Sequence, residues 1–150
     1  MWQDHMRQIL LRHVVIGAAI AVLLAFASPS YADTVQFQAD LKGSAEVPPN
    51  QTTGSGTVTA TYDTSTKQLT WDGSYSGLTG PATAAHFHGP AEPGKNAGVA
   101  VPITPATSPL HGSATLTDAQ ASDLMAGSWY VNIHTEANKG GELRGQLMKM

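Results

Sequence analysis

The stretch GSGTVTATYDTSTKQLTWDGSYSGL, residues 54–78, alternates between apolar and polar side chains on both sides of a short polar turn. The side chains that would share one face are Val58, Ala60 and Tyr62 before the turn TSTK, and Leu69, Trp71, Gly73 and Tyr75 after it. A period of two is typical of a half-buried β-strand. Two such runs joined by a few polar residues predict an antiparallel β-hairpin.

Strand patterns continue on both sides of this hairpin, with turn residues about every 8 to 12 positions. Pro48 and Pro49 remove two backbone donors, so the segment around them is expected to be an irregular connection, and Pro102 indicates an edge strand. The further strands are expected at residues 34–41, 82–89, 99–104 and 111–117, and on both sides of the turn ANKGG. The predicted fold is all-β: an antiparallel, Greek-key-like β-sandwich or flattened barrel of about 7 to 8 strands.

One segment has a helical pattern instead. In TDAQASDLMAG, Thr117 is placed to cap a helix and Gln120 follows three residues later, which is the spacing of a capping box. Leu124 and Met125 provide an apolar side, and Gly127 is suited to end the helix. These features predict one short helix over residues 118–126, inserted between strands.

Residues 1–32 have the pattern of a secretory signal peptide, with a basic start, an apolar run at 14–27 and small residues at Ser30 and Ala32. The apolar run is shorter than the roughly 20 residues that span a bilayer. We therefore expect cleavage after Ala32, one domain over residues 33–150, and a periplasmic or secreted location.

The composition excludes several classes of function. The chain has 150 residues, a formal net charge of −3 and no cysteine. It has no basic patch for nucleic acid and, after signal cleavage, no basic amphipathic helix for a membrane surface. The lack of cysteine removes thiolate zinc sites, iron–sulfur clusters and cysteine nucleophiles. No G-x-S-x-G elbow is present, the acids lie mostly in turns, and no catalytic residue is predicted.

The sequence HFH places two histidines on one side of a predicted strand. His86 and His88 are two residues apart and share a face, while Phe87 points to the other side. In YVNIHTEA, alternation places His134 on the face opposite Val131 and Ile133, where it can share a site with the first two. A rigid strand pair that presents imidazoles in this way is suited to chelate a metal ion.

Other residues of the sequence could also serve as metal ligands. His111 begins a predicted strand and is a possible fourth ligand. Imidazole ligands favour copper, with zinc as the second choice. Met148 and Met150 are soft donors suited to Cu(I), but the C-terminal MKM is expected to be frayed, and Met125 is expected in the core. Glu142 and Arg144 are expected to form a surface ion pair, and Asn50 begins a glycosylation sequon that matters only in a eukaryotic secretory pathway.

Several blocks in order resemble the CHRD domain, the repeat unit first named in chordin and common in bacterial exported proteins. The blocks are LKGSAEVPP, GSGTVTATYD, GLTGPATAAHFHGPAEPGKNAGVAVPI and LTDAQASDLMAGSWYVNIHTEANKGGELRGQL, which together cover about residues 35–147. The resemblance implies a β-sandwich domain of poorly defined function, often found alone behind a signal peptide.

HFH, NIHT and GGELRG are also, more faintly, similar to Cu/Zn superoxide dismutase. That similarity implies copper ligands at His86, His88 and His134, and an anion-guiding cation at Arg144. The zinc-loop cluster and the disulfide of that family are absent, and the loop after His88 is too short. Three hypotheses remain: copper binding without turnover, a metal-free interaction module for an unknown protein partner, and a dismutase-like enzyme.

Overall fold

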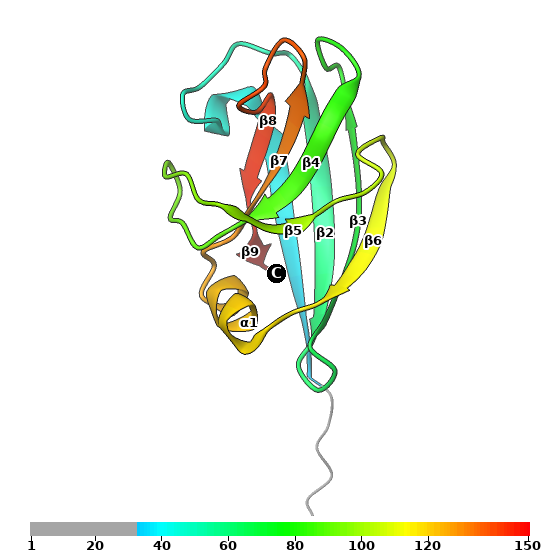
Figure 1. The fold of residues 1–150 in the computed structure, drawn as a ribbon, viewed down its shortest axis with the longest axis vertical. Helices are drawn as coiled ribbons and strands as arrows, with labels where there is room; N and C mark the ends of the chain where they lie inside the picture. Colours follow the sequence, from blue (N-terminus) through cyan, green and yellow to red (C-terminus); the bar gives the residue numbers. More distant parts are fainter. Residues whose placement is uncertain (1–32) are drawn as a thin grey trace, which may run out of the picture.

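A computed structural model describes residues 33–150, so the predicted signal peptide at residues 1–32 lies outside the described residues. The strands are β1 (Thr34–Lys42), β2 (Ser55–Asp63), β3 (Gln68–Ser76), β4 (Ala82–His88), β5 (Val99–Pro102), β6 (Leu110–Thr115), β7 (Tyr130–Thr135), β8 (Leu143–Gln146) and β9 (Met148–Lys149). They form one antiparallel sheet in the order β5-β4-β7-β8-β1-β2-β3-β6, with β9 paired to β1 (Figure 1). The all-β prediction is confirmed, and the continuous sheet matches the flattened-barrel alternative.

The hairpin predicted from residues 54–78 is present as β2 and β3. Its register runs without a break from Ser55 opposite Ser76 to Asp63 opposite Gln68. The apolar side chains predicted to share a face are buried or partly buried, and the buried ones are Val58, Ala60, Tyr62, Leu69 and Trp71. This hairpin therefore supplies one wall of the core.

The sheet curls until its two halves face each other. Trp71 on β3 and Phe87 on β4 pack edge to face with their ring centroids 5.1 Å apart, although four strands lie between β4 and β3 in the sheet order. The outermost strands of the order are β5 and β6. The edge position predicted from Pro102 is therefore confirmed, since β5 pairs with β4 at one end of the sheet.

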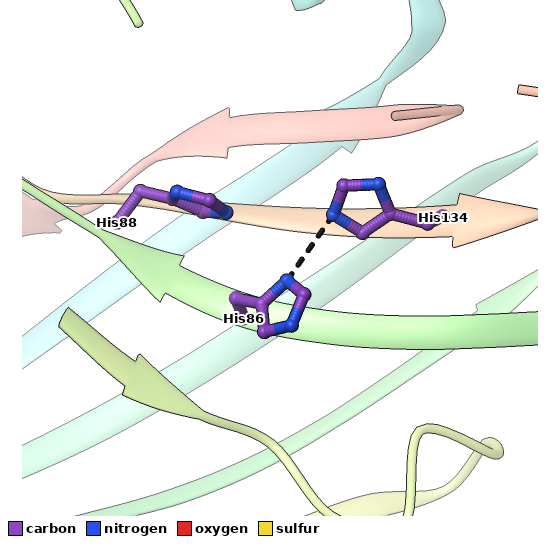
Figure 2. Close-up of side chains that lie close together, drawn as sticks. All are labelled: His86, His88 and His134. Atoms are coloured by element: carbon purple, nitrogen blue, oxygen red, sulfur yellow. Dashed lines mark hydrogen bonds between the residues drawn. The ribbon is translucent and has the colours of Figure 1, made fainter. Parts of the chain in front are cut away.

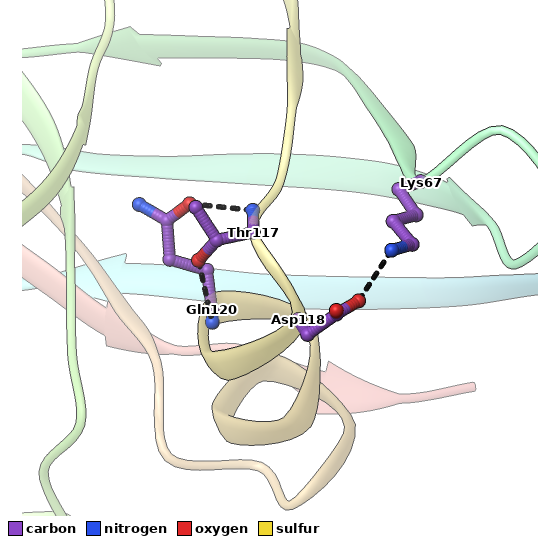
Figure 3. Close-up of polar contacts among 4 residues, drawn as sticks. All are labelled: Lys67, Thr117, Asp118 and Gln120. Atoms are coloured by element: carbon purple, nitrogen blue, oxygen red, sulfur yellow. Dashed lines mark hydrogen bonds and ion pairs between the residues drawn. The ribbon is translucent and has the colours of Figure 1, made fainter.

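The predicted helix is confirmed as α1 (Asp118–Met125), with Ala126 as its C-cap. Both hydrogen bonds of the capping box between Thr117 and Gln120 are formed, and Lys67 forms an ion pair with Asp118 (Figure 3). Within residues 33–150, no helix has the length and apolar character needed to cross a bilayer.

The connection between β1 and β2 begins with a 3-10 turn, η1 (Gly43–Ala45), and is otherwise irregular, as the two prolines predict. It is held to the far end of the chain by its own polar side chains. Asn50 Nδ2 donates to the backbone carbonyl of Glu142 at 3.0 Å. The side chain of Glu46 reaches Asn132 on β7. The connection therefore covers part of the outer face of the sheet.

Candidate metal centre

Strands β4 and β7 are antiparallel neighbours, and their register brings three histidines together. His86 pairs with Asn132, and Ala84 pairs with His134. Phe87 and Ile133 are fully buried in the core, so the histidines on the alternate positions point outward. One ring nitrogen from each of His86, His88 and His134 lies within 4.8 Å of the others.

The three rings are turned toward a common point (Figure 2). His86 Nδ1 lies 3.2 Å from His134 Nε2. The ring centroid of His86 is 5.4 Å from that of His88 and 5.1 Å from that of His134. The convergence expected from the sequence is therefore present in the fold, at the outer face of β4 and β7.

Backbone carbonyls determine which nitrogen of two of these rings carries the proton. His88 Nδ1 lies 3.0 Å from the carbonyl oxygen of Ala97, and His134 Nδ1 lies 2.8 Å from that of Lys139. A carbonyl oxygen can only accept, so each Nδ1 donates its proton and each Nε2 keeps a lone pair. Such an outer hydrogen bond is the usual way in which proteins orient a metal-binding imidazole.

One of these lone pairs has no partner. His88 Nε2 is buried and has no hydrogen bond. Among residues 33–150 only two other buried side-chain nitrogen or oxygen atoms have no hydrogen-bond partner. One of them, Asn132 Oδ1, lies on the same face of the sheet as the histidines. A buried acceptor without a donor costs free energy, which a bound cation would remove.

Burial keeps the rings in the form that binds metals. Burial lowers the pKa of His86, and the neighbouring His134 and His88 lower it further. Burial also lowers the pKa of His88, although the carbonyl of Ala97 partly opposes this change. Both imidazoles therefore stay neutral at neutral pH, and a neutral imidazole is the metal ligand.

Arg144 on β8 lies beside this site, opposite Asn132 on β7, and is not at the surface. It is 2% exposed, and its guanidinium donates to Asn96 Oδ1 at 2.8 Å and to the carbonyl of Lys95 at 2.5 Å. Its Cζ lies 3.5 Å from the ring centre of Tyr130, and that ring stacks on His88 at 4.8 Å. The expected surface ion pair with Glu142 is wrong, and a buried guanidinium does not offer the anion-guiding cation that the dismutase similarity implied.

Glu142 is also fully buried, with hydroxyl and amide donors around it. It accepts from the hydroxyls of Thr52, Thr79 and Thr135 at 2.6–2.7 Å. Burial alone would raise its pKa, but these hydrogen bonds outweigh that effect and lower the pKa to about 2. This carboxylate therefore ties together loops that flank the histidines, including the turn that carries Lys139.

Glu46 is a residue of this region that the sequence did not single out. It is 5% exposed, and its Oε1 lies 2.5 Å from Asn132 Nδ2. Burial raises its pKa to about 7, although the nearby Arg144 opposes the change. The sequence does show Glu46 as one acid in an otherwise apolar and proline-rich run, AEVPP. The neighbouring residues, however, do not reveal which strand that run covers.

The other sequence candidates lie elsewhere. His111 is exposed on β6, with its Nδ1 2.5 Å from Asp72 Oδ1, and the structure does not bring it to the three clustered histidines. Met125 packs against the core as expected. Met148 and Met150 lie at the C-terminal end, in and just after β9.

Residues 33–150 form one antiparallel β-sheet that carries three imidazoles on its outer face. The family model described as the CHRD domain matches residues 37–147. This match covers most of the chain, so the chain belongs to the CHRD family, as the sequence blocks had indicated. No curated protein and no solved structure matches the chain.

Proposed function

We propose that this CHRD-domain protein binds one copper ion through His86, His88 and His134 and does not turn over a substrate. The observation that carries this proposal is the buried Nε2 of His88, which has no hydrogen-bond partner and belongs to a cluster in which one ring nitrogen from each of the three histidines lies within 4.8 Å of the others. On the pattern of the N-terminal residues, we place this function in the periplasm or outside the cell.

A metal-free interaction module explains the unpartnered Nε2 of His88 less well than a metal site does. Without an ion, His86 and His134 satisfy each other through the contact at 3.2 Å. His88 gains nothing from that contact, and its Nε2 remains buried without a donor. In a purely structural cluster this arrangement would lower the stability of the fold, because an unpaired buried acceptor is destabilising.

The donor set favours copper over other ions. All three ligands are neutral imidazoles, which suit copper and zinc and do not suit calcium or magnesium. Divalent copper binds a given nitrogen site more tightly than zinc does, so copper is the first choice and zinc the second. We expect no dismutase activity, because the cation that would attract the anion, Arg144, is 2% exposed.

The test is metal retention by the purified chain. After loading with Cu(II) and exhaustive dialysis, elemental analysis is expected to find one copper per chain, with nitrogen hyperfine structure in the electron paramagnetic resonance spectrum. The His88→Ala variant is expected to lose this copper. The matched control is His111→Ala, which removes an exposed imidazole outside the cluster and should retain the metal.

Circular dichroism of each variant separates loss of metal from loss of fold. If the wild-type chain retains no copper while remaining folded, the metal function is wrong and the interaction module is preferred. If zinc is retained and copper is not, the site is correct but the ion is wrong. Superoxide turnover by the copper-loaded chain would contradict the absence of catalysis.

A further inference from the structure

The C-terminal MKM, expected to be frayed, is an ordered strand. In β9, Met148 pairs with Gln38 and Lys149 pairs with Phe37 of β1. Met150 continues this pairing, since its backbone N–H donates to the carbonyl of Gln36 at 3.0 Å. The conformation of the two terminal methionines is therefore imposed by a neighbouring strand.

This pairing determines where the two thioethers point. Phe37 and Ala39 on β1 are buried, so Gln38 between them faces outward, and its partner Met148 does the same. Met150 lies two residues further and shares that face, about 6.6 Å along the strand. Met148 is 59% exposed and Met150 is 66% exposed.

The two methionines border a shallow hollow of about 360 Å³ on the outer surface. Three of the side chains that line it, those of Gln38, Asp40 and Gln146, carry an oxygen donor, and Lys149 adds a cation. The residues lining the hollow are Gln38, Asp40, Gln146, Met148, Lys149 and Met150. Among residues 33–150 the only other large apolar side chain left exposed is Val99, so the thioethers are an unusual feature of this surface.

Thioether sulfur is a soft, uncharged donor. It suits Cu(I) and chemically similar monovalent ions, and it is a poor ligand for hard cations. The unbranched methionine side chain has three rotatable bonds, so two of them on one strand face can close on a single ion. An amide or carboxylate oxygen of the hollow can then complete the coordination.

We propose that Met148 and Met150 form a second metal site, which takes a soft monovalent ion, Cu(I) or Ag(I). This site is separate from the three histidines and uses none of their atoms. It does not rest on the proposed copper function, because its donors, its strands and its preferred oxidation state are different.

The test uses Ag(I) as a redox-inert probe and the full chain labelled with carbon-13 at the methionine methyl groups. The signals of Met125, Met148 and Met150 are assigned by single Met→Leu substitutions. Chloride-free nitrate buffer keeps the silver in solution. We expect the methyl signals of Met148 and Met150 to shift together and to saturate with one ion, while Met125, which packs against the core, stays unchanged.

The same titration in the His86→Ala/His88→Ala/His134→Ala variant separates this proposal from the first one. The methionine shifts are expected to persist there, so failure of the histidine site would leave them intact. If the two signals do not shift, or if Met125 shifts equally, the methionine site is wrong. Equal shifts with Zn(II) would also overturn it, because zinc does not favour thioethers.

Conservative variants test whether both sulfurs act on one ion. Met148→Leu and Met150→Leu keep the size and apolar character of the side chains and remove one donor each. Either change is expected to weaken Ag(I) binding by roughly tenfold or more, because the second donor then acts without the first. A single variant that binds as tightly as the wild type would show that the two methionines do not share an ion. Anaerobic competition for Cu(I) with a coloured chelator should give the same ranking.

Discussion

At the scale of single residues, Glu142 is a buried charge that the fold stabilises by hydrogen bonds. The Glu142→Gln variant removes the negative charge that accepts hydrogen bonds from the hydroxyls of Thr52, Thr79 and Thr135. We expect the free energy of unfolding at neutral pH to fall by about 3 kcal/mol, measured by chemical denaturation. The control, Glu136→Gln, removes an exposed carboxylate of the same turn and should change stability little.

The sign of the pH dependence at Glu142 follows from its lowered pKa. A carboxyl that is more acidic in the folded state contributes stability above its unfolded value, 4.5. That contribution is lost as the pH falls through about 2. The difference between wild type and Glu142→Gln should therefore shrink on acidification, and a constant difference from neutral pH to pH 2 would contradict this account.

Glu46 should show the opposite pH dependence. Its pKa is raised to about 7 by burial, so the folded state holds a proton that the unfolded chain has already lost. Stability is therefore expected to decrease between pH 4.5 and about 7, by up to about 3 kcal/mol. The Glu46→Gln variant should lack this decrease, since a glutamine still accepts from Asn132 and does not ionise.

The histidines contribute equally to the pH dependence of both chains. Their contribution therefore cancels in the difference between the free energies of unfolding of wild type and Glu46→Gln at each pH. Denaturation at a series of pH values gives that difference directly. A difference that stays constant between pH 4.5 and 8 would show that Glu46 ionises normally in the folded state.

Strand alternation in the sequence correctly predicted which face of the sheet the histidines lie on. It could not predict whether a distant segment of the chain covers that face. Alternation correctly placed His86, His88 and His134 on the outer face. It also placed Glu142 and Arg144 together on one strand face, where a surface ion pair was expected, but both side chains are buried. The connection after β1 and the loop after β4 cover that face, and no local pattern reveals such coverage.

At the scale of elements, the turn between β7 and β8 depends on one glycine. Gly141 has φ +135°, and an added Cβ would lie 2.1 Å from Asn132 Nδ2 and 2.3 Å from Glu46 Oε1. We expect Gly141→Ala to lower the free energy of unfolding by more than about 2 kcal/mol. Thermal denaturation measures this loss.

The adjacent glycine is a matched control for that variant. At Gly140 an added Cβ meets nothing within 4 Å. Gly140→Ala should therefore fold with nearly wild-type stability. If both variants are equally destabilised, the cause is the flexibility of the turn, and the collision with Asn132 and Glu46 is not the reason.

Element-level prediction was accurate for the strands and for α1, because both have strong local patterns. The hairpin at residues 54–78 and the capping box at Thr117 are read from adjacent residues. The strand order was not predictable in this way, since β1 pairs with β8 and β9 at the far end of the chain. The C-terminal MKM was therefore expected to be frayed, because its partner is about 110 residues away.

At the scale of the whole molecule, copper binding should stabilise the folded state. An ion that binds only the folded chain adds about 2.7 kcal/mol at a free concentration 100 times its Kd. We therefore expect Cu(II) to raise the Tm of the wild type, and a strong chelator to reverse the shift. Scanning calorimetry measures both.

The comparison variant for this shift is His134→Ala, which removes a half-buried imidazole of the cluster and leaves the core residues in place. Its Tm should not respond to Cu(II) at the same concentration. An equal rise in the variant would mean that copper binds outside the three histidines.

Two loops hold the rings of His88 and His134 through main-chain atoms, the carbonyls of Ala97 and Lys139. Any amino acid supplies the same carbonyl, so most side chains of these loops are free to change during evolution while the rings keep their orientation. The length of each loop is not free in this way, because one inserted or deleted residue moves the carbonyl away from its imidazole. Related chains that keep this cluster should therefore agree in the length of these loops and, apart from positions such as Asn96 and Gly141 whose own contacts matter, vary in their amino acids.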